Sequence, residues 1–332
     1  MSWQSADLLK RQIPLLDYLQ GQGWKPARRS TGGRLMGLCP LHTDHRPSFL
    51  ADPGKNPFYC YGCGRGGDVI RLAELYYGVR FANAMALLWR WSGPGSLLPD
   101  VATFCQMQLH RHAEAVDYLL QRGLHRAEPI EQLRIGYAPG RCMRARLTSL
   151  GYPLGYPLES LRQAGLANAE GHDTYSHRIV FPLEGNLYGR STGAAFPHMF
   201  LPASKGGLYA WDRVRKYPEI ILAEGMFDLA VLWQAGFDNV TCALGNHPNA
   251  LQFRQLCTDD ECEGRPRTVY LAFDADANGS GRQAAQRLAQ RLRAAGITAR
   301  RVELPNGHDP NSFFVSGGDA RQFHGLLERA CL

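Results

Sequence analysis

Four potential metal ligands in the N-terminal quarter of the chain constrain the fold most. Cys39-Pro40-Leu41-His42 forms one pair on a tight turn, and after seventeen intervening residues Cys60-Tyr61-Gly62-Cys63 forms a second. Two such pairs joined by a loop are what a tetrahedral zinc ion requires, and Gly62 and Gly64 allow the chain to wrap closely around a metal. The alternative is two buried thiols beside a surface histidine. We predict a closed, structural zinc site that stabilises the folded lobe by roughly 10–16 kcal/mol, as in zinc-finger peptides.

Two acidic segments in the last third of the chain each follow a short apolar run. Glu224 and Asp228 come after the run 220–223, and Asp274 and Asp276 come after the run 269–273. Both runs are typical of buried strands, and the carboxyl ends of parallel strands line the ligand crevice of an open sheet. Clustered carboxylates repel each other unless a cation lies between them, and hard oxygen ligands favour Mg²⁺ or Mn²⁺. We therefore expect a divalent-metal site for phosphoryl chemistry; the alternative is helix caps and solvated loop acids.

Composition and charge narrow the class of protein. The chain has 332 residues, a formal net charge of +7 and 45% hydrophobic residues, which fits a multidomain globular protein with a polyanionic partner. It has no apolar run of 18 residues and no basic-then-apolar N-terminus, so we expect neither a membrane span nor a secretory signal. Nine cysteines without an export signal favour metal ligation over disulfides and indicate a reducing, cytoplasmic location.

Local patterns predict three units of α/β and α+β structure. Apolar spacing predicts helices over 4–20, split near Pro14, and over 69–90, interrupted at Gly78. Another helical stretch runs from 101 to 120, and short strands are expected at 178–183 and 186–191. After residue 217, strands near 219–223, 241–246, 268–273 and 298–304 alternate with helices, which predicts a parallel sheet. The expected divisions are 1–92, a linker at 93–100, 101–216 and 217–332.

The zinc segment resembles the N-terminal zinc ribbon of DnaG-type bacterial primases. The resemblance is carried by Cys39-Pro40-Leu41-His42, Arg46-Pro47-Ser48-Phe49, Tyr59-Cys60-Tyr61-Gly62-Cys63-Gly64 and Gly66-Gly67-Asp68-Val69-Ile70. In that family the ribbon touches the single-stranded template. The resemblance implies that Arg46 and Arg65 contact phosphates while Phe49, Tyr59 and Tyr61 stack on bases. The alternative for these aromatic residues is packing around the zinc core.

Later segments are similar to the remaining catalytic parts of the same primases. Four segments match the basic subdomain: Arg122-Gly123-Leu124, the run 134–139, the run 177–183 and Tyr188-Gly189-Arg190. This implies that Arg134, Arg178, Arg190 and Lys205 bind template or nucleotide phosphates; ordinary surface arginines are the alternative for Arg178 and Arg190.

The acidic segments Glu224-Gly225-Met226-Phe227-Asp228 and Asp274-Ala275-Asp276 are similar to the Toprim metal-binding module. The chain departs from the primase family at two positions. His198 stands where the family commonly has lysine, which weakens that contact at neutral pH. Asp309 is kept, but Asn311 replaces a second aspartate. Asn311 is expected to offer an oxygen ligand without charge, so a second metal would bind more weakly or through water. Cys257 and Cys262 have no partner pair, and we interpret them as loop thiols rather than half of a metal site.

The resemblance implies a DNA-dependent RNA primase that uses ribonucleoside triphosphates on single-stranded DNA. Glu224, Asp274 and Asp276 are the first choices for Mg²⁺ or Mn²⁺ ligands, followed by Asp228 and Asp309; Glu224 is alternatively a general base. The chain ends about twenty residues after Asn311, so we expect no helicase-docking domain. Two interpretations stay open: the protein belongs to a plasmid, phage or other mobile element, or it holds a helicase or single-strand-binding partner in another way. The alternatives are a Toprim nuclease and a catalytically inactive single-stranded-DNA-binding protein.

Overall fold

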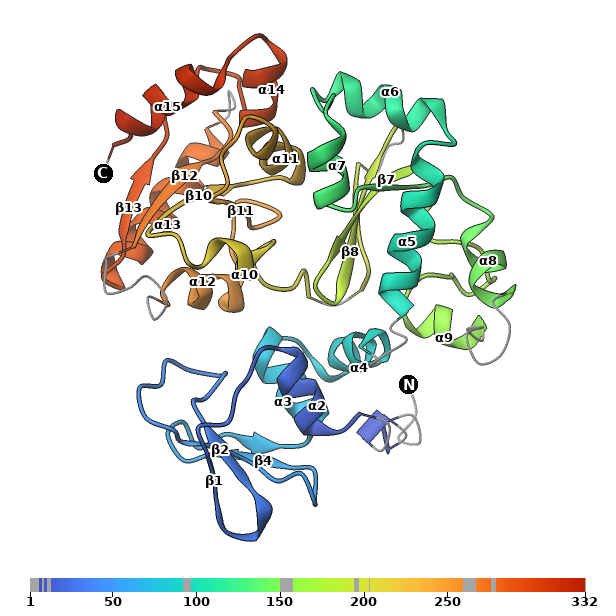
Figure 1. Cartoon of the computed structure of the whole chain (residues 1–332), viewed down its shortest axis with the longest axis vertical. Coiled ribbons are helices and arrows are strands. Elements are labelled where there is room, and N and C mark those ends of the chain that lie inside the picture. Colours follow the sequence, from blue (N-terminus) through green and yellow to red (C-terminus); the bar gives the residue numbers. More distant parts are fainter. Residues whose placement is uncertain are drawn as a thin grey trace.

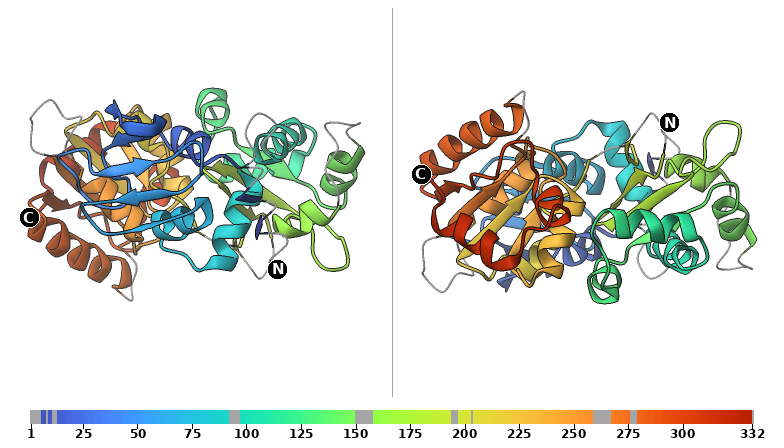
Figure 2. Two further views of the ribbon diagram at one scale, coloured as in Figure 1. Left: turned by 90° about the horizontal axis from the view of Figure 1, so that it is seen from below. Right: turned by 90° about the horizontal axis from the view of Figure 1, so that it is seen from above.

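The chain folds into three lobes, each with its own sheet. The computed structural model describes residues 6–7, 9–10, 13–91, 97–149, 158–193, 197–202, 204–258, 267–275 and 279–331. The middle and C-terminal lobes lie side by side, and the N-terminal lobe lies against one end of the pair (Figure 1). Seen from that end, the N-terminal lobe covers part of the C-terminal lobe (Figure 2). The expected combination of a zinc ribbon, an α+β lobe and a parallel α/β lobe is confirmed.

The N-terminal lobe is a five-stranded antiparallel sheet packed with helices. Its elements are α2 (Leu15–Gly21), β1 (Arg28–Arg29), the 3-10 helix η1 (Thr31–Gly33), β2 (Leu35–Gly37), β3 (Phe49–Ala51), β4 (Phe58–Cys60), β5 (Gly66–Gly67), α3 (Val69–Tyr77) and α4 (Phe81–Arg90). Pro14 precedes α2 as its N-cap, as the predicted split requires. Gly78 ends α3 in the left-handed conformation (φ 67°), which separates α3 from α4 where the sequence predicted an interruption.

The middle lobe is built on a four-stranded antiparallel sheet of order β6-β7-β8-β9. Its elements are α5 (Leu97–Leu109), α6 (Ala113–Gln121), α7 (Ala127–Gln132), β6 (Gly136–Ala138), α8 (Met143–Ser149), α9 (Leu158–Gln163), β7 (Arg178–Leu183), β8 (Asn186–Ser191) and β9 (His198–Phe200). Strands β7 and β8 have the predicted bounds. Two expectations need correction. Residues 97–100, expected in a linker, begin α5, and the rest of the expected linker, 93–96, lies outside the described residues.

The second correction concerns the helix expected from 101 to 120, which is two helices with a turn between them. Leu109 and Ala115 both pack in the core shared with the C-terminal lobe. Six residues apart on one continuous helix, they would point about 120° away from each other. The turn before α6 therefore lets both side chains reach the same core.

The C-terminal lobe contains a four-stranded parallel sheet of order β11-β10-β12-β13. Its elements are α10 (Trp211–Val214), β10 (Glu219–Ala223), α11 (Met226–Gln234), β11 (Val240–Cys242), α12 (Ala250–Leu256), β12 (Thr268–Ala272), α13 (Ser280–Ala294), β13 (Thr298–Arg301), α14 (Pro310–Val315) and α15 (Ala320–Glu328). Alternate residues of β10 face opposite layers, with Leu222 toward α12 and α13 and Ile221 toward α11, α14 and α15. The predicted parallel sheet is confirmed.

Two contacts position the lobes. The middle and C-terminal lobes share one apolar core, in which the Phe181 and Phe227 rings lie 5.3 Å apart. The N-terminal lobe contacts α12, where Leu251 joins its apolar cluster and Arg254 donates to the carbonyl oxygens of Leu41 (3.0 Å) and Tyr76 (2.9 Å). In the described part of the chain, no helix combines the length and apolar character needed to span a bilayer.

Candidate active site and zinc site

A cavity of about 470 Å³ lies where the middle and C-terminal lobes meet. Its volume falls in the range typical of small-molecule sites. The lining carries charges of both signs. The acidic residues, together called the carboxylate wall, are Glu224, Asp228, Asp274 and Asp309; the basic and imidazole side chains, together called the basic wall, are Arg122, Arg190, His198 and Lys205. This arrangement offers carboxylates to cations and cations to phosphates within one space.

Parallel pairing brings the carboxylates together. Strands β10 and β12 are neighbours with Ala223 opposite Ala272, so the chain leaves both strands at the same edge of the sheet. Glu224 follows β10 directly, and Asp274 follows two residues after β12. The predicted convergence of these two residues with Asp228 is therefore observed. Asp276, expected beside them, lies outside the described residues.

Asp228 is buried and serves as a hydrogen-bond acceptor for two loops. Its Oδ2 accepts from the backbone N–H of Gly225 (2.9 Å), and its Oδ1 accepts from the backbone N–H of Asn311 (3.0 Å). Burial raises its pKa well above the ordinary value, and the nearby charges of Asp309 and Asp274 raise it further. Since both oxygens are occupied by backbone amides, we infer that Asp228 supports the site rather than supplying its main metal ligand.

Asp309 and Asn311 do not act together as a pair of metal ligands. Asp309 is the N-cap of α14 and accepts from the backbone N–H of Ser312 while lining the cavity. Asn311 is only 2% exposed, and its Nδ2 donates to the carbonyl oxygen of Arg122 at 2.7 Å. Asn311 is not among the described residues that line the cavity, so the expectation of an oxygen ligand there is corrected. It connects α14 to the turn that carries Arg122.

The basic wall is held by hydrogen bonds and aromatic rings. Lys205 Nζ donates to the carbonyl oxygen of Leu244 at 2.6 Å and lies 5.0 Å from the centre of the Phe200 ring. Burial lowers the pKa of Lys205 below its ordinary value. Arg190 Nε donates to Tyr118 Oη at 3.2 Å. Both residues were predicted as phosphate ligands, and both line the cavity.

Arg122 is a cavity residue that sequence reasoning did not select. Its guanidinium lies 4.7 Å from the centre of the Phe227 ring. The sequence placed Arg122 only in a segment that resembles the basic subdomain. Its place in the cavity depends on long-range contacts with α11 and α14, and the only local signal was its position next to Gly123 after an amphipathic helix.

The other predicted phosphate ligands lie outside the cavity. Arg178 is 9% exposed on β7, and burial lowers its pKa. Arg134 donates to Gln106 (3.2 Å) and Thr103 (3.2 Å) on α5. Arg46 and Arg65 belong to the N-terminal lobe, where Arg65 donates to the Leu41 carbonyl at 3.2 Å. Nucleic-acid contacts by these four residues stay predictions.

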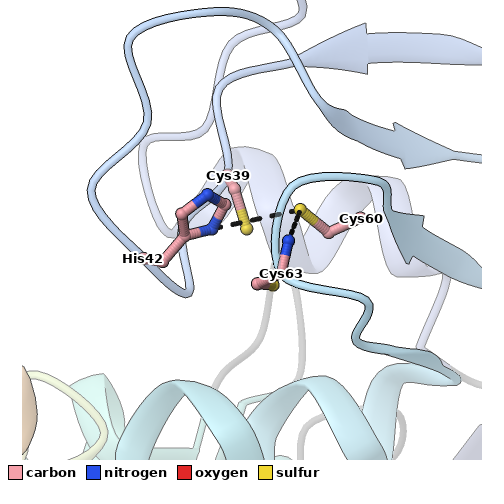
Figure 3. A group of neighbouring side chains, drawn as sticks. All are labelled: Cys39, His42, Cys60 and Cys63. Carbon is pink, nitrogen blue, oxygen red and sulfur yellow. Dashed lines mark hydrogen bonds between the residues drawn. The ribbon is translucent and has the colours of Figure 1, made fainter.

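The four predicted zinc ligands are brought together at one point. The ligand atoms of Cys39, His42, Cys60 and Cys63 all lie within 4.8 Å of one another (Figure 3). Among the described residues, this is the one group of three or more possible ligands gathered so closely; the carboxylates of the cavity are more widely spread. Three thiols and one imidazole on two turns match a closed tetrahedral zinc site.

Neighbouring groups support the zinc ligands. Burial raises the pKa of the Cys60 thiol, but hydrogen bonding with the Ser48 hydroxyl and a hydrogen bond from the Cys63 backbone N–H lower it overall. A Cβ on Gly62 would lie 2.9 Å from the His42 Nε2 atom, so only glycine fits this turn without displacing the ligand.

Of the aromatic residues considered for base stacking, Phe49 is buried and packs in the core. Tyr59 (45% exposed) and Tyr61 (66%) face solvent with their rings 5.1 Å apart.

Gly281 permits the close approach that positions Asp274. A Cβ at this position would lie 2.3 Å from the carbonyl oxygen of Asp274. We expect Gly281→Ala to lower the free energy of unfolding by about 1–3 kcal/mol, the usual cost of overpacking, measured by urea denaturation. Gly193→Ala is the matched control, since no atom of the residues that the structure describes, its chain neighbours aside, lies within 4 Å of its Cβ position. Equal stability of the two variants would contradict this interpretation of the Asp274 loop.

Three family models match consecutive parts of the chain. They are the CHC2 zinc finger over residues 4–93, the N-terminal domain of the DNA primase catalytic core over 103–193, and the Toprim domain over 219–320. The order and spacing of these three domains agree with the three lobes. The chain belongs to the DnaG-type primase family.

Individual DnaG-type primases are similar along nearly the whole chain. The DNA primase of Halalkalibacterium halodurans is 26% identical over 96% of this chain and 58% of its own length. The DNA primase of Aquifex aeolicus is 28% identical over 94% of this chain and 66% of its own length. The chain therefore spans less than two thirds of these two relatives.

Solved structures of DnaG-type primases share the fold. The zinc-binding and RNA polymerase domains of the Aquifex aeolicus primase match with a TM-score of 0.57 and 25% identity, covering 99% of this chain and 86% of theirs. A DnaG primase catalytic domain bound to ssDNA matches with a TM-score of 0.59 and 23% identity, covering 76% and 83%.

Proposed function

We propose that this chain is a DNA-dependent RNA primase that joins ribonucleoside triphosphates on a single-stranded DNA template. The observation that carries the proposal is the cavity, which is lined both by carboxylates at the ends of β10 and β12 and by the cations Arg122, Arg190 and Lys205. Nucleotidyl transfer needs both walls, because charge develops at the attacking hydroxyl and on the leaving pyrophosphate. Membership in the DnaG-type family supports this reading.

We assign the metal-binding role to Glu224, Asp274 and Asp309, with Asp276 as an additional ligand. Their oxygens are the donors that Mg²⁺ and Mn²⁺ prefer. When bound, such ions would lower the pKa of the primer 3′-hydroxyl and neutralise charge on the triphosphate. Arg190 and Lys205 would hold the triphosphate, and Arg122 would add positive charge beside it. Glu224 as a general base is the alternative assignment for that residue.

We place the template on the basic surface around the cavity and on the zinc lobe. A DnaG catalytic domain bound to ssDNA shares this fold and supports single-stranded DNA as the partner. On the zinc lobe, the exposed rings of Tyr59 and Tyr61 are available for stacking on unpaired bases. A helicase or single-strand-binding partner is a further expectation, for which we assign no contact residues.

One assay tests the proposal against its alternatives. The protein is incubated with single-stranded DNA, labelled ribonucleotides and Mg²⁺ or Mn²⁺, and the products are separated on a denaturing gel. Short labelled RNA that depends on template and metal supports a primase. Shortened DNA without RNA would indicate a Toprim nuclease, and a gel shift without either product would indicate a binding protein.

A further inference from the structure

His198 lies opposite Arg190 at the rim of the cavity. The β8–β9 register pairs Arg190 with His198, and Tyr188 lies on the same face of β8 two residues earlier. Arg190 Nη1 is 2.7 Å from His198 Nε2, and Tyr188 Oη is 2.8 Å from His198 Nδ1. The imidazole therefore connects two side chains of β8, one of which carries charge into the cavity.

These contacts determine the protonation state of His198. A guanidinium can only donate hydrogen bonds, so His198 Nε2 must be the acceptor. A neutral imidazole has one N–H, which is then on Nδ1 and donates to Tyr188 Oη. A doubly protonated ring would lose the Nε2 lone pair and place two cations 2.7 Å apart.

The surrounding charges favour the same neutral form. Burial lowers the pKa of His198 below its ordinary value of 6.5, and four cations lower it further. These cations are Arg190 on β8, Lys205 after β9, Arg122 after α6 and Arg178 on β7. Tyr188 is a titratable neighbour that accepts from the ring, and the carboxylates that line the same cavity are Glu224, Asp228, Asp274 and Asp309.

We propose that His198 is a positioning residue that, as a neutral hydrogen-bond acceptor, holds the Arg190 guanidinium in its phosphate-binding orientation. Arg190 is then fixed from two sides, by Tyr118 Oη at Nε and by His198 at Nη1. The inference rests on the proposed function in one respect, since it takes the bound group to be a nucleoside triphosphate. Protonation of His198 releases Arg190, so nucleotide affinity falls as the pH drops through the pKa of His198, which lies below the ordinary value of 6.5.

Nucleotide binding across pH tests this role without requiring synthesis. We would measure the dissociation constant of a fluorescent ATP analogue with Mn²⁺ from pH 5.5 to 8 for the unchanged protein, His198→Gln and His198→Ala. The glutamine carboxamide oxygen can replace Nε2 as the acceptor but does not titrate. We expect the ratio of the unchanged protein's dissociation constant to that of His198→Gln to rise toward the acidic end of this range, approaching about fivefold as His198 becomes protonated. Comparing these two proteins cancels titration of the nucleotide and the carboxylates.

A double-mutant comparison separates positioning from general structural support. His198→Ala is expected to weaken binding about fivefold at pH 7.5, and to have no further effect when Arg190 is already alanine. Additive losses, a ratio independent of pH, or tighter binding at low pH would overturn the proposal; the last result would make His198 itself a phosphate ligand. A protein that follows the expected binding pattern but makes no RNA would instead refute the proposed primase function.

Discussion

Replacement of Asp274 with alanine is expected to abolish RNA synthesis while single-stranded DNA binding stays within about twofold. A metal ligand acts mainly on the transition state of nucleotidyl transfer, whereas template affinity comes from cationic and aromatic groups elsewhere. Residues that only orient metal ligands typically cost 10–100-fold when removed, so loss of a ligand itself should exceed about 100-fold. Primer yield on a gel and DNA affinity by fluorescence anisotropy measure the two effects separately.

The control for Asp274→Ala is Glu328, an acidic residue of the same lobe that is not among the residues lining the cavity. Glu328 is 68% exposed in its side chain and pairs only with the imidazole of His324 among the ion pairs described. Glu328→Gln removes one negative charge and should leave both synthesis and DNA binding unchanged. Synthesis by Asp274→Ala near the level of this control would show that the carboxylate wall was assigned incorrectly.

Cys60→Ser is expected to release zinc and unfold the N-terminal lobe around residues 39–65. Cys60 is fully buried on β4, and its Sγ accepts from the Cys63 backbone at 3.5 Å. Zinc binding contributes roughly 10–16 kcal/mol in zinc-finger peptides, more than a small lobe can lose and stay folded. Elemental analysis should fall from one zinc per chain to nearly none, and protease cleavage should concentrate in this lobe.

The same substitution at a cysteine outside the zinc cluster separates zinc loss from a general effect of removing a thiol. Cys331→Ser changes an exposed cysteine at the other end of the chain and should keep the full zinc content. Because the middle and C-terminal lobes share a separate core, urea denaturation of Cys60→Ser should still show their cooperative transition. Unchanged zinc content in Cys60→Ser would contradict the four-ligand site.

Sequence reasoning was most accurate where a local pattern and its structural cause lie close together. The four zinc ligands are recognised by spacing, because the two short turns that carry them are local and the metal requires little else. Strands β7, β8 and β10 follow from apolar runs bounded by turn residues. Glu224 and Asp274 could be paired because parallel strands end at one edge of a sheet, whatever the rest of the lobe does.

The prediction of which basic residues bind phosphate in the cavity was less accurate, because charge alone does not indicate which way a side chain points. Arg178 and Arg190 lie on paired strands, opposite Ser191 and Ile179 respectively, yet one is buried under the sheet and the other lines the cavity. Arg122 enters the cavity only because Phe227 and Asn311, both distant in sequence, hold its turn in place. No local pattern predicts such contacts.

The sequence by itself therefore determined the ligand types, the alternation of strands and helices in the C-terminal lobe, and the family. The tertiary structure alone decided which charged groups share the cavity, and which protonation states and hydrogen-bond partners these groups have. Asp228 becomes a buried acceptor for two loops, Asn311 becomes a support for Arg122, and His198 becomes the neutral partner of Arg190. The physical reason is that burial and hydrogen bonding depend on neighbours supplied by distant parts of the chain, and these neighbours exist only after the lobes have packed together.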